Sequence, residues 1–182
     1  SSTSDAIAIT TDADGTITFA SKSKKTTSGD GYVIQNEWHH YAITYQNGRV
    51  SFLRDGIRIK TAATSFGLAT LDFSDGFTMG SSAKGMHTIM DEFRIWSKVL
   101  SDENIRNYCN QPIYNVDSVE KADNLILYYD FNQDSGNAAD LTSGHHDGIR
   151  SGFGPDGDAW SSSIGVFTLN FDNSPINAED VT

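Results

Sequence analysis

The amino-acid sequence predicts an all-β protein, an antiparallel β-sandwich with one short helix. Its apolar residues lie in short segments separated by Gly, Asp and Ser, and the chain contains only 3 prolines. Two of the separating segments are Asn-Gly and Asp-Gly pairs, which are typical of tight β-hairpins. Strands do not alternate with long helices along the chain, so a parallel α/β sheet is not expected.

The clearest part of this pattern is an antiparallel meander in which "WHHYAITYQ", "RVSFLR" and "IRIK" are the strands. Asn47-Gly48 joins the first two strands, and Asp55-Gly56 joins the second and third. Both residues of such a pair tolerate the positive φ angles of a type I′ turn. Alternate residues of the first strand share one face, and these are Tyr41, Ile43 and Tyr45.

Further strands and one helix are expected outside the meander. The other strand candidates are "AIAIT", "TITFA", "GYVI", "DGFTMGS", "HTIMDEFRIW", "LILYYDF" and "GVFTLNF". "SDENIRNYCN" predicts a helix that Ser101 caps, with Asp102 and Glu103 at the positive end of the helix dipole. Its narrow apolar stripe includes Ile105 and Cys109, so the helix is expected to lie on the sandwich.

Charge and composition exclude several classes of function. The 24 Asp and Glu against 13 Lys and Arg give a formal net charge of −11, which repels nucleic acid and anionic membranes. No apolar run approaches the roughly 20 residues of a transmembrane helix, and the N-terminus lacks the features of a secretory signal. Cys109 is the only cysteine, so no internal disulfide can form. We therefore expect a soluble protein with no nucleic-acid partner and no transmembrane segment.

Three segments resemble a known family when they are taken together. They are "NEWHHYAITYQNGRVSFLRDG", "FTMGS" and "MDEFRIWSKVLSDENIRNY", in this order. They resemble the Trp-His-His strand and Asp-Gly hairpin, the following strand, and the closing strand and helix of laminin-G-like modules. Those modules have the concanavalin A-like lectin/glucanase jelly-roll fold, and the resemblance covers roughly residues 30–110.

The resemblance also gives an expected domain organisation. We expect residues 1–112 to form the laminin-G-like jelly-roll core, without the usual opening strands of the family. Residues 113–182 are expected to form a C-terminal extension that completes or packs on the same sandwich, and the alternative is that "LILYYDF" starts a second module. Bacteroidetes surface proteins carry modules with similar tails. The resemblance therefore implies an extracellular or cell-surface location within a larger multidomain chain.

Glu37, His39 and His40 lie around Trp38, and they could belong either to an active site or to the fold. The resemblance favours the fold, with Trp38 between the sheets, one histidine bonded within the sandwich and the other at its surface. Glycosidases that share this jelly roll place carboxylates on one strand as Glu-x-Asp-x-Glu, and the chain has no such motif. A catalytic pair assembled across strands stays open. We expect that the protein is not an enzyme.

The resemblance further implies a structural calcium ion at one end of the sandwich. Its expected ligands are Asp91, Asp140 and Asp147, and Asp156 and Asp158 are further candidates. Oxygen ligands in Gly-rich loops suit calcium. Because Asp and Gly are also what turns require, hydrogen bonding within the loops is the alternative.

The expected function is non-catalytic carbohydrate binding, as a module of a secreted or surface-anchored glycan-handling protein. The expected ligand-binding residues are Trp160, Asp158 and His146, because the ring of Trp160 offers a face on which a sugar can stack. A structural or adhesion module that binds proteins is the alternative, and a glycoside hydrolase is the third candidate. The sequence does not identify the glycan.

Overall fold

The computed structural model describes residues 7–21, 24–64, 78–79, 89–109, 111–133 and 135–149. The chain divides into two compact units, which are described separately. Unit 1 comprises Ser1–Met79 and Ser101–Cys109, and unit 2 comprises Gly80–Leu100 and Asn110–Thr182.

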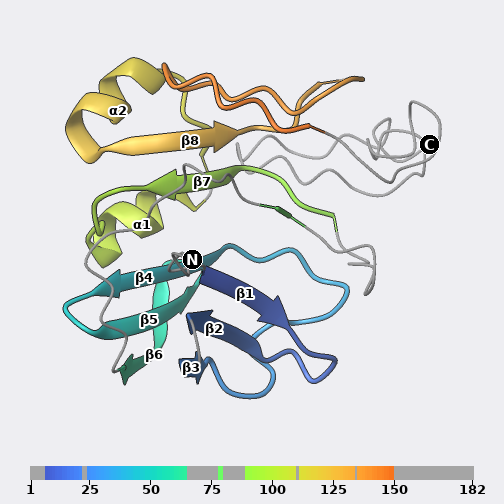
Figure 1. The fold of residues 1–182 in the computed structure, drawn as a ribbon, viewed down its shortest axis with the longest axis vertical. Helices are drawn as coiled ribbons and strands as arrows, with labels where there is room; N and C mark the ends of the chain where they lie inside the picture. Colours follow the sequence, from blue (N-terminus) through green and yellow to red (C-terminus); the bar gives the residue numbers. More distant parts are fainter. Residues whose placement is uncertain are drawn as a thin grey trace, which may run out of the picture. The chain divides into compact units, whose positions relative to one another are not determined.

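Unit 1 contains two three-stranded antiparallel sheets and a helix (Figure 1). The strand order is β1-β2-β3 in one sheet and β4-β5-β6 in the other. The first sheet consists of β1 (Ile7–Thr11), β2 (Ile17–Ser21) and β3 (Lys24–Thr27). The second consists of β4 (Tyr41–Gln46), β5 (Arg49–Arg54) and β6 (Ile57–Ala63), and the helix is α1 (Asp102–Tyr108).

The core of unit 1 lies between these two sheets. Ile17 and Phe19 of β2 pack with Val50 and Phe52 of β5, and all four side chains are buried. Partly buried side chains from β4 join them, and these are Tyr41, Ile43 and Tyr45, as the alternation of the sequence predicts. Two sheets packed face to face over one core form a β-sandwich, so the predicted fold class is confirmed.

Both predicted hairpin turns are present in the second sheet. Asn47 and Gly48 have φ angles of 50° and 73°, and Asp55 and Gly56 have φ angles of 51° and 70°. Gly56 is required for a second reason, since a Cβ atom there would lie 2.7 Å from the Cα of Arg106 in α1. The turn between β5 and β6 therefore contacts the helix backbone directly.

The helix begins where the sequence predicts. The Ser101 side chain accepts a hydrogen bond from the backbone N–H of Asn104 at 3.1 Å, and Asp102 and Glu103 occupy the first turn. Ile105 and Cys109 are buried, as expected for the apolar stripe of this helix.

Two expectations for unit 1 are wrong, and one of its strands was not predicted. "GYVI" is a turn rather than a strand, and Tyr32 within it is buried and donates a hydrogen bond to the carbonyl of Leu53. Lys24–Thr27 form β3 although their polar sequence does not indicate a strand, because they pair with β2. Trp38 is only partly buried and does not belong to the core cluster, in which the ring of Tyr32 lies instead.

Unit 2 is built around the antiparallel pair of β7 (Phe93–Trp96) and β8 (Leu125–Tyr129), with the helix α2 (Val116–Asp123) before β8. The strand pairing joins residues from both sides of the predicted boundary at 112. The sequence analysis did not predict α2, which makes two helices rather than one in the described part of the chain. The predicted strands "GVFTLNF" and most of "DGFTMGS" lie outside the described residues.

A buried polar network connects β7, β8 and the segment before α2. Arg94 and Glu92 form an ion pair, and each side chain is 6% exposed. The Tyr128 hydroxyl donates to a Glu92 carboxylate oxygen at 2.7 Å and accepts from the backbone N–H of Ile113 at 3.2 Å. Arg94 also donates to the carbonyl of Gln111 at 2.8 Å, and its guanidinium lies 5.0 Å from the centre of the Tyr128 ring. These contacts satisfy polar groups that would destabilise the unit if they were buried alone.

Candidate functional site

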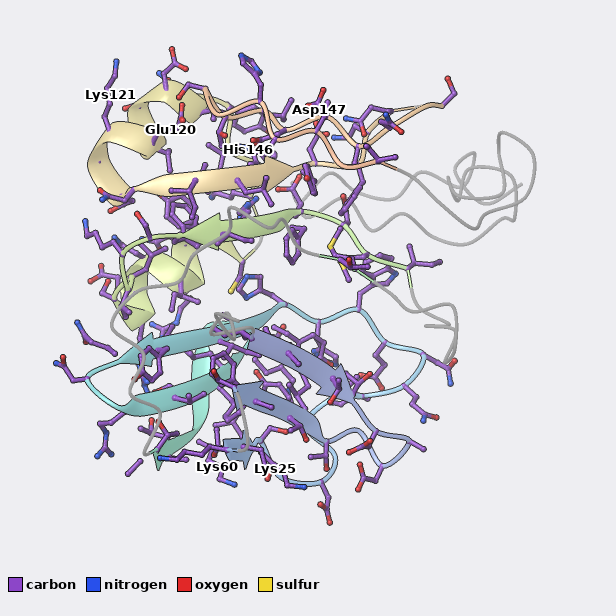
Figure 2. All side chains as sticks on the ribbon, viewed as in Figure 1. Lys25, Lys60, Glu120, Lys121, His146 and Asp147 are labelled. Carbon is purple, nitrogen blue, oxygen red and sulfur yellow. The ribbon has the colours of Figure 1, made fainter. Side chains whose placement is uncertain are left out.

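The candidate site residues that the structure describes lie mainly in the loop after β8. We call residues 138–148 the Asp140 loop, which a backbone bridge between Ala138 and Gly148 closes. Figure 2 shows its residues His146 and Asp147, and it shows Glu120 on α2 in the same unit. Glu120 ties α2 to the loop, because it accepts hydrogen bonds from both the backbone N–H and the hydroxyl of Ser143.

Asp140 holds the conformation of this loop. One carboxylate oxygen accepts from the backbone N–H groups of Tyr128 and Thr142, each at 3.0 Å. The other accepts from the hydroxyl of Thr142 and from the backbone N–H of His146, each at 2.9 Å. The backbone N–H of Asp140 donates in turn to the side chain of Asp147 at 2.9 Å. One buried side chain therefore organises strand β8 and both halves of the loop.

These contacts also determine the charge of Asp140. Burial raises the pKa of this carboxyl, but the backbone hydrogen bonds from Thr142, Tyr128 and His146 outweigh burial and lower the pKa below its usual 3.8. The carboxylate is therefore ionised at neutral pH. Its charge is balanced by hydrogen-bond donors of the chain itself.

The predicted calcium ligands do not form one site. Both oxygens of Asp140 already accept two hydrogen bonds each, which leaves no lone pair directed at an ion. Asp91 belongs to a different cluster, described below, and Asp147 is exposed. Within the described ranges, no group of three or more His, Cys, Asp or Glu side chains is arranged to hold a metal ion. Asp140 therefore does not fit the calcium role, and the alternative of hydrogen bonding within the loop applies to it.

His146 lies at the surface of the Asp140 loop. Its side chain is exposed, while its backbone N–H bonds to Asp140 and its carbonyl accepts from the Tyr129 hydroxyl at 2.6 Å. A Cβ atom at Gly144 would lie 2.7 Å from the His146 ring, so the ring packs directly over this glycine. The loop thus presents His146 in a fixed position. The other two expected ligand-binding residues, Asp158 and Trp160, lie outside the described residues.

Asp91 lies in an acidic cluster that the sequence analysis did not identify. Burial raises the pKa of Asp91 to about 7, and the negative charges of Glu92 and Asp130 add to this effect. Burial also raises the pKa of Glu92, although its ion pair with Arg94 and its bond from Tyr128 act in the opposite direction. The signal in the sequence was the adjacent pair Asp91-Glu92, but the electrostatic effect of Asp130 on this pair depends on the pairing of β7 with β8.

The histidines of the meander make contacts within unit 1. The two ring nitrogens of His39 lie 2.7 Å from Asp55 and 3.1 Å from Glu37. The Nδ1 atom of His40 lies 3.1 Å from the Sγ atom of Cys109, whose residue is 3% exposed. His39 thus connects the segment before β4 to the hairpin turn, and His40 connects it to the end of α1. These contacts favour a structural role for both histidines.

The two packed sheets define the protein as a β-sandwich. The histidines of its meander contact other residues of the same sandwich. The sequence profile of the concanavalin A-like lectin/glucanases superfamily matches residues 1–106. The chain belongs to this superfamily, as its laminin-G-like segments indicated.

The comparisons with solved structures and with curated proteins do not add to this family assignment. A solved S-layer domain-containing protein of Clostridium thermocellum (residues 221–444) is 25% identical, and the match has a TM-score of 0.37. The match covers 59% of this chain and 58% of that one. No curated protein matches the chain. In the part of the chain that the structure describes, no helix is long and apolar enough to cross a membrane.

Proposed function

We propose that the chain is a non-catalytic carbohydrate-binding module of a secreted or surface-anchored glycan-handling protein. The observation that carries this proposal is its membership of the concanavalin A-like lectin/glucanases superfamily. The name of the superfamily covers both lectins and glucanases, so the absence of a catalytic role has to be argued from the residues.

The contacts of the titratable residues support a binding role over a catalytic one. Both ring nitrogens of His39 lie against carboxylates, and the Nδ1 atom of His40 lies against a buried thiol, so these three nitrogens are engaged within the protein. Asp140 is occupied by four hydrogen bonds, which keep it from acting as a nucleophile or a general base. The Asp140 loop is held by its own hydrogen bonds and exposes His146. It is therefore preorganised to form hydrogen bonds with a ligand.

A glycan array followed by calorimetric titration of each hit tests this proposal. Arrays of plant, host and microbial glycans cover the three sources from which such a module would draw its ligand. We expect saturable binding to one of these classes. Heat-unfolded protein is the control, since nonspecific adsorption persists after unfolding and a binding site does not. Absence of binding to all three classes would exclude a carbohydrate ligand.

The second candidate is a module that binds another protein. It is favoured by two exposed isoleucines on β6, Ile57 at 59% and Ile59 at 46% exposure. Adjacent exposed apolar side chains are typical of protein contact surfaces. Replacing both isoleucines with Thr should abolish binding of a protein partner and leave glycan binding unchanged, so the double variant separates the two kinds of contact.

A further inference from the structure

Tyr114 is an exposed aromatic residue among the described residues of unit 2. The residue is 85% exposed. It is also the only aromatic residue among the large exposed apolar residues of the described part of the chain. Neither the sequence analysis nor the comparisons point to it.

The backbone on the N-terminal side of Tyr114 is held by the buried network of unit 2. Arg94, with its side chain 6% exposed, donates to the carbonyl of Gln111 at 2.8 Å. The hydroxyl of Tyr128 accepts from the N–H of Ile113 at 3.2 Å. Ile113 itself is buried at 7% exposure. The backbone on this side is therefore held by hydrogen bonds to two buried side chains, those of Arg94 and Tyr128.

The backbone on the C-terminal side of Tyr114 is held by the start of α2. Asn115 is the N-cap, and its side chain accepts from the backbone N–H of Ser118 at 3.1 Å. The carbonyl of Asn115 accepts from the N–H of Val119 at 3.2 Å. Tyr114 thus lies between two fixed residues while its ring is in solvent. The backbone that carries this ring therefore loses little conformational freedom when a ligand stacks on the ring.

The surroundings of the ring favour a sugar over a protein as its partner. The sequence neighbours with exposed side chains are polar, namely Gln111, Asn115 and Asp117. A protein interface requires a contiguous apolar patch of several hundred Å², which a single tyrosine among polar residues does not provide. A pyranose ring has an apolar face of C–H groups and a rim of hydroxyls, so it matches an aromatic face with polar side chains around it.

We propose that Tyr114 is the stacking platform for a pyranose unit of a neutral oligosaccharide. The inference rests on the proposed carbohydrate-binding function and adds the binding residue and the chemical class of the ligand to it. The ring supplies the contact with the C–H face, and Gln111, Asn115 and Asp117 supply hydrogen-bond partners for the hydroxyls.

The test is affinity electrophoresis of the full chain through gels that contain soluble β-glucan, xylan, galactan or mannan. The variants are Tyr114→Ala, Tyr114→Phe and Ile149→Ala. Ile149 is the matched control, because it belongs to the same unit and is 84% exposed. We expect Tyr114→Ala to weaken binding about tenfold and Tyr114→Phe, which keeps the ring and loses only the hydroxyl, to weaken it less, while Ile149→Ala binds as the unchanged chain does. Melting temperatures are expected to agree among all four proteins, since an exposed side chain contributes little to stability.

A second measurement detects the contact with Tyr114 directly and does not depend on a variant that loses binding. Ring resonances of 13C-tyrosine in the unchanged chain are recorded with and without the retarding polysaccharide, and Tyr114→Phe identifies the signal. We expect the Tyr114 signal to shift on binding. The inference would be overturned if Tyr114→Ala binds as strongly as the unchanged chain, or if binding leaves the Tyr114 signal in place. The proposed function would still stand in either case. No retardation of the unchanged chain in any gel, and no hit on the glycan array, would overturn both.

Discussion

The raised pKa of Asp91 makes the stability of unit 2 depend on pH in a direction that is unusual for an aspartate. The pKa rises from 3.8 to about 7 in the folded chain, first because of burial and then because of Glu92. A raised folded pKa means that the folded state binds the proton more tightly than the unfolded state. The contribution of Asp91 to the stability of unit 2 is therefore largest below about pH 4, decreases as the pH rises from about 4 to about 7, and is constant above that range.

The size of this effect follows from the two pKa values. The difference between 3.8 and about 7 corresponds to about 4 kcal/mol if the carboxyl were fully removed from water. Asp91 is only partly buried, so solvent screens its charge, and we reduce the expected total loss of unfolding free energy to about 2 kcal/mol, of which about 1 kcal/mol falls between pH 5 and pH 8. Replacing Asp91 with Asn removes the titrating group. The amide oxygen can still accept the hydrogen bond from the backbone N–H of Glu92, which is 2.9 Å from Oδ1 in the aspartate.

Amide hydrogen exchange of the β7 and β8 residues measures the stability of unit 2 without the contribution of unit 1. Protection factors of paired residues such as Ile95 and Leu127 are compared at pH 5, 6, 7 and 8 in both proteins. We expect protection to decrease with pH more steeply in the unchanged chain than in Asp91→Asn, and protection at pH 8 to be higher in Asp91→Asn. Equal pH dependence in the two proteins would refute the assignment to Asp91.

Three other substitutions are expected to reduce stability. Replacing Asp140 with Ala leaves four donors without an acceptor, so the free energy of unfolding in urea should decrease by about 3 kcal/mol or more. Recovery of stability on adding calcium would contradict the role of Asp140 as a hydrogen-bond acceptor. Gly56→Ala should destabilise more than Gly48→Ala, by about 1 kcal/mol or more, because only the first brings a Cβ atom within 2.7 Å of Arg106; equal melting temperatures would argue against the contact. Glu92→Gln should cost about 3 kcal/mol in urea unfolding, because it leaves a buried guanidinium without its charge partner, and an unchanged urea midpoint would contradict a stabilising ion pair between Glu92 and Arg94.

The parts of the fold that could be predicted from the sequence are those set by local chemistry. Asn47-Gly48 and Asp55-Gly56 predict their turns because few residue pairs accept positive φ at both positions. Ser101 predicts the start of α1 because its side chain satisfies an N–H of the first turn. These features depend on residues that are close in the sequence.

The parts that could not be predicted depend on distant residues. Lys24–Thr27 become a strand only through pairing with β2, and α2 has a cap at each end but no buried residue that would give it an apolar stripe. Tyr114 could not be identified as an exposed ring because "QPIYN" gives no periodicity, and the contacts that fix it come from Arg94 and Tyr128.

Asp91 and Asp140 show why the sequence could not assign the candidate site. Both are aspartates of unit 2, and both were predicted to bind calcium on the same grounds. Asp140 accepts four hydrogen bonds from the loop and has a lowered pKa, whereas a single backbone N–H and two neighbouring carboxyls surround Asp91, whose pKa is about 7. The number of donors that reach each carboxyl is determined by the pairing of β7 with β8 and by the closure of the Asp140 loop, not by the neighbouring residues in the sequence. Because Asp140 loses its contribution as the pH falls below about 4, while Asp91 reduces stability as the pH rises above about 4, unit 2 should be most stable in mildly acidic solution, near pH 4 to 5.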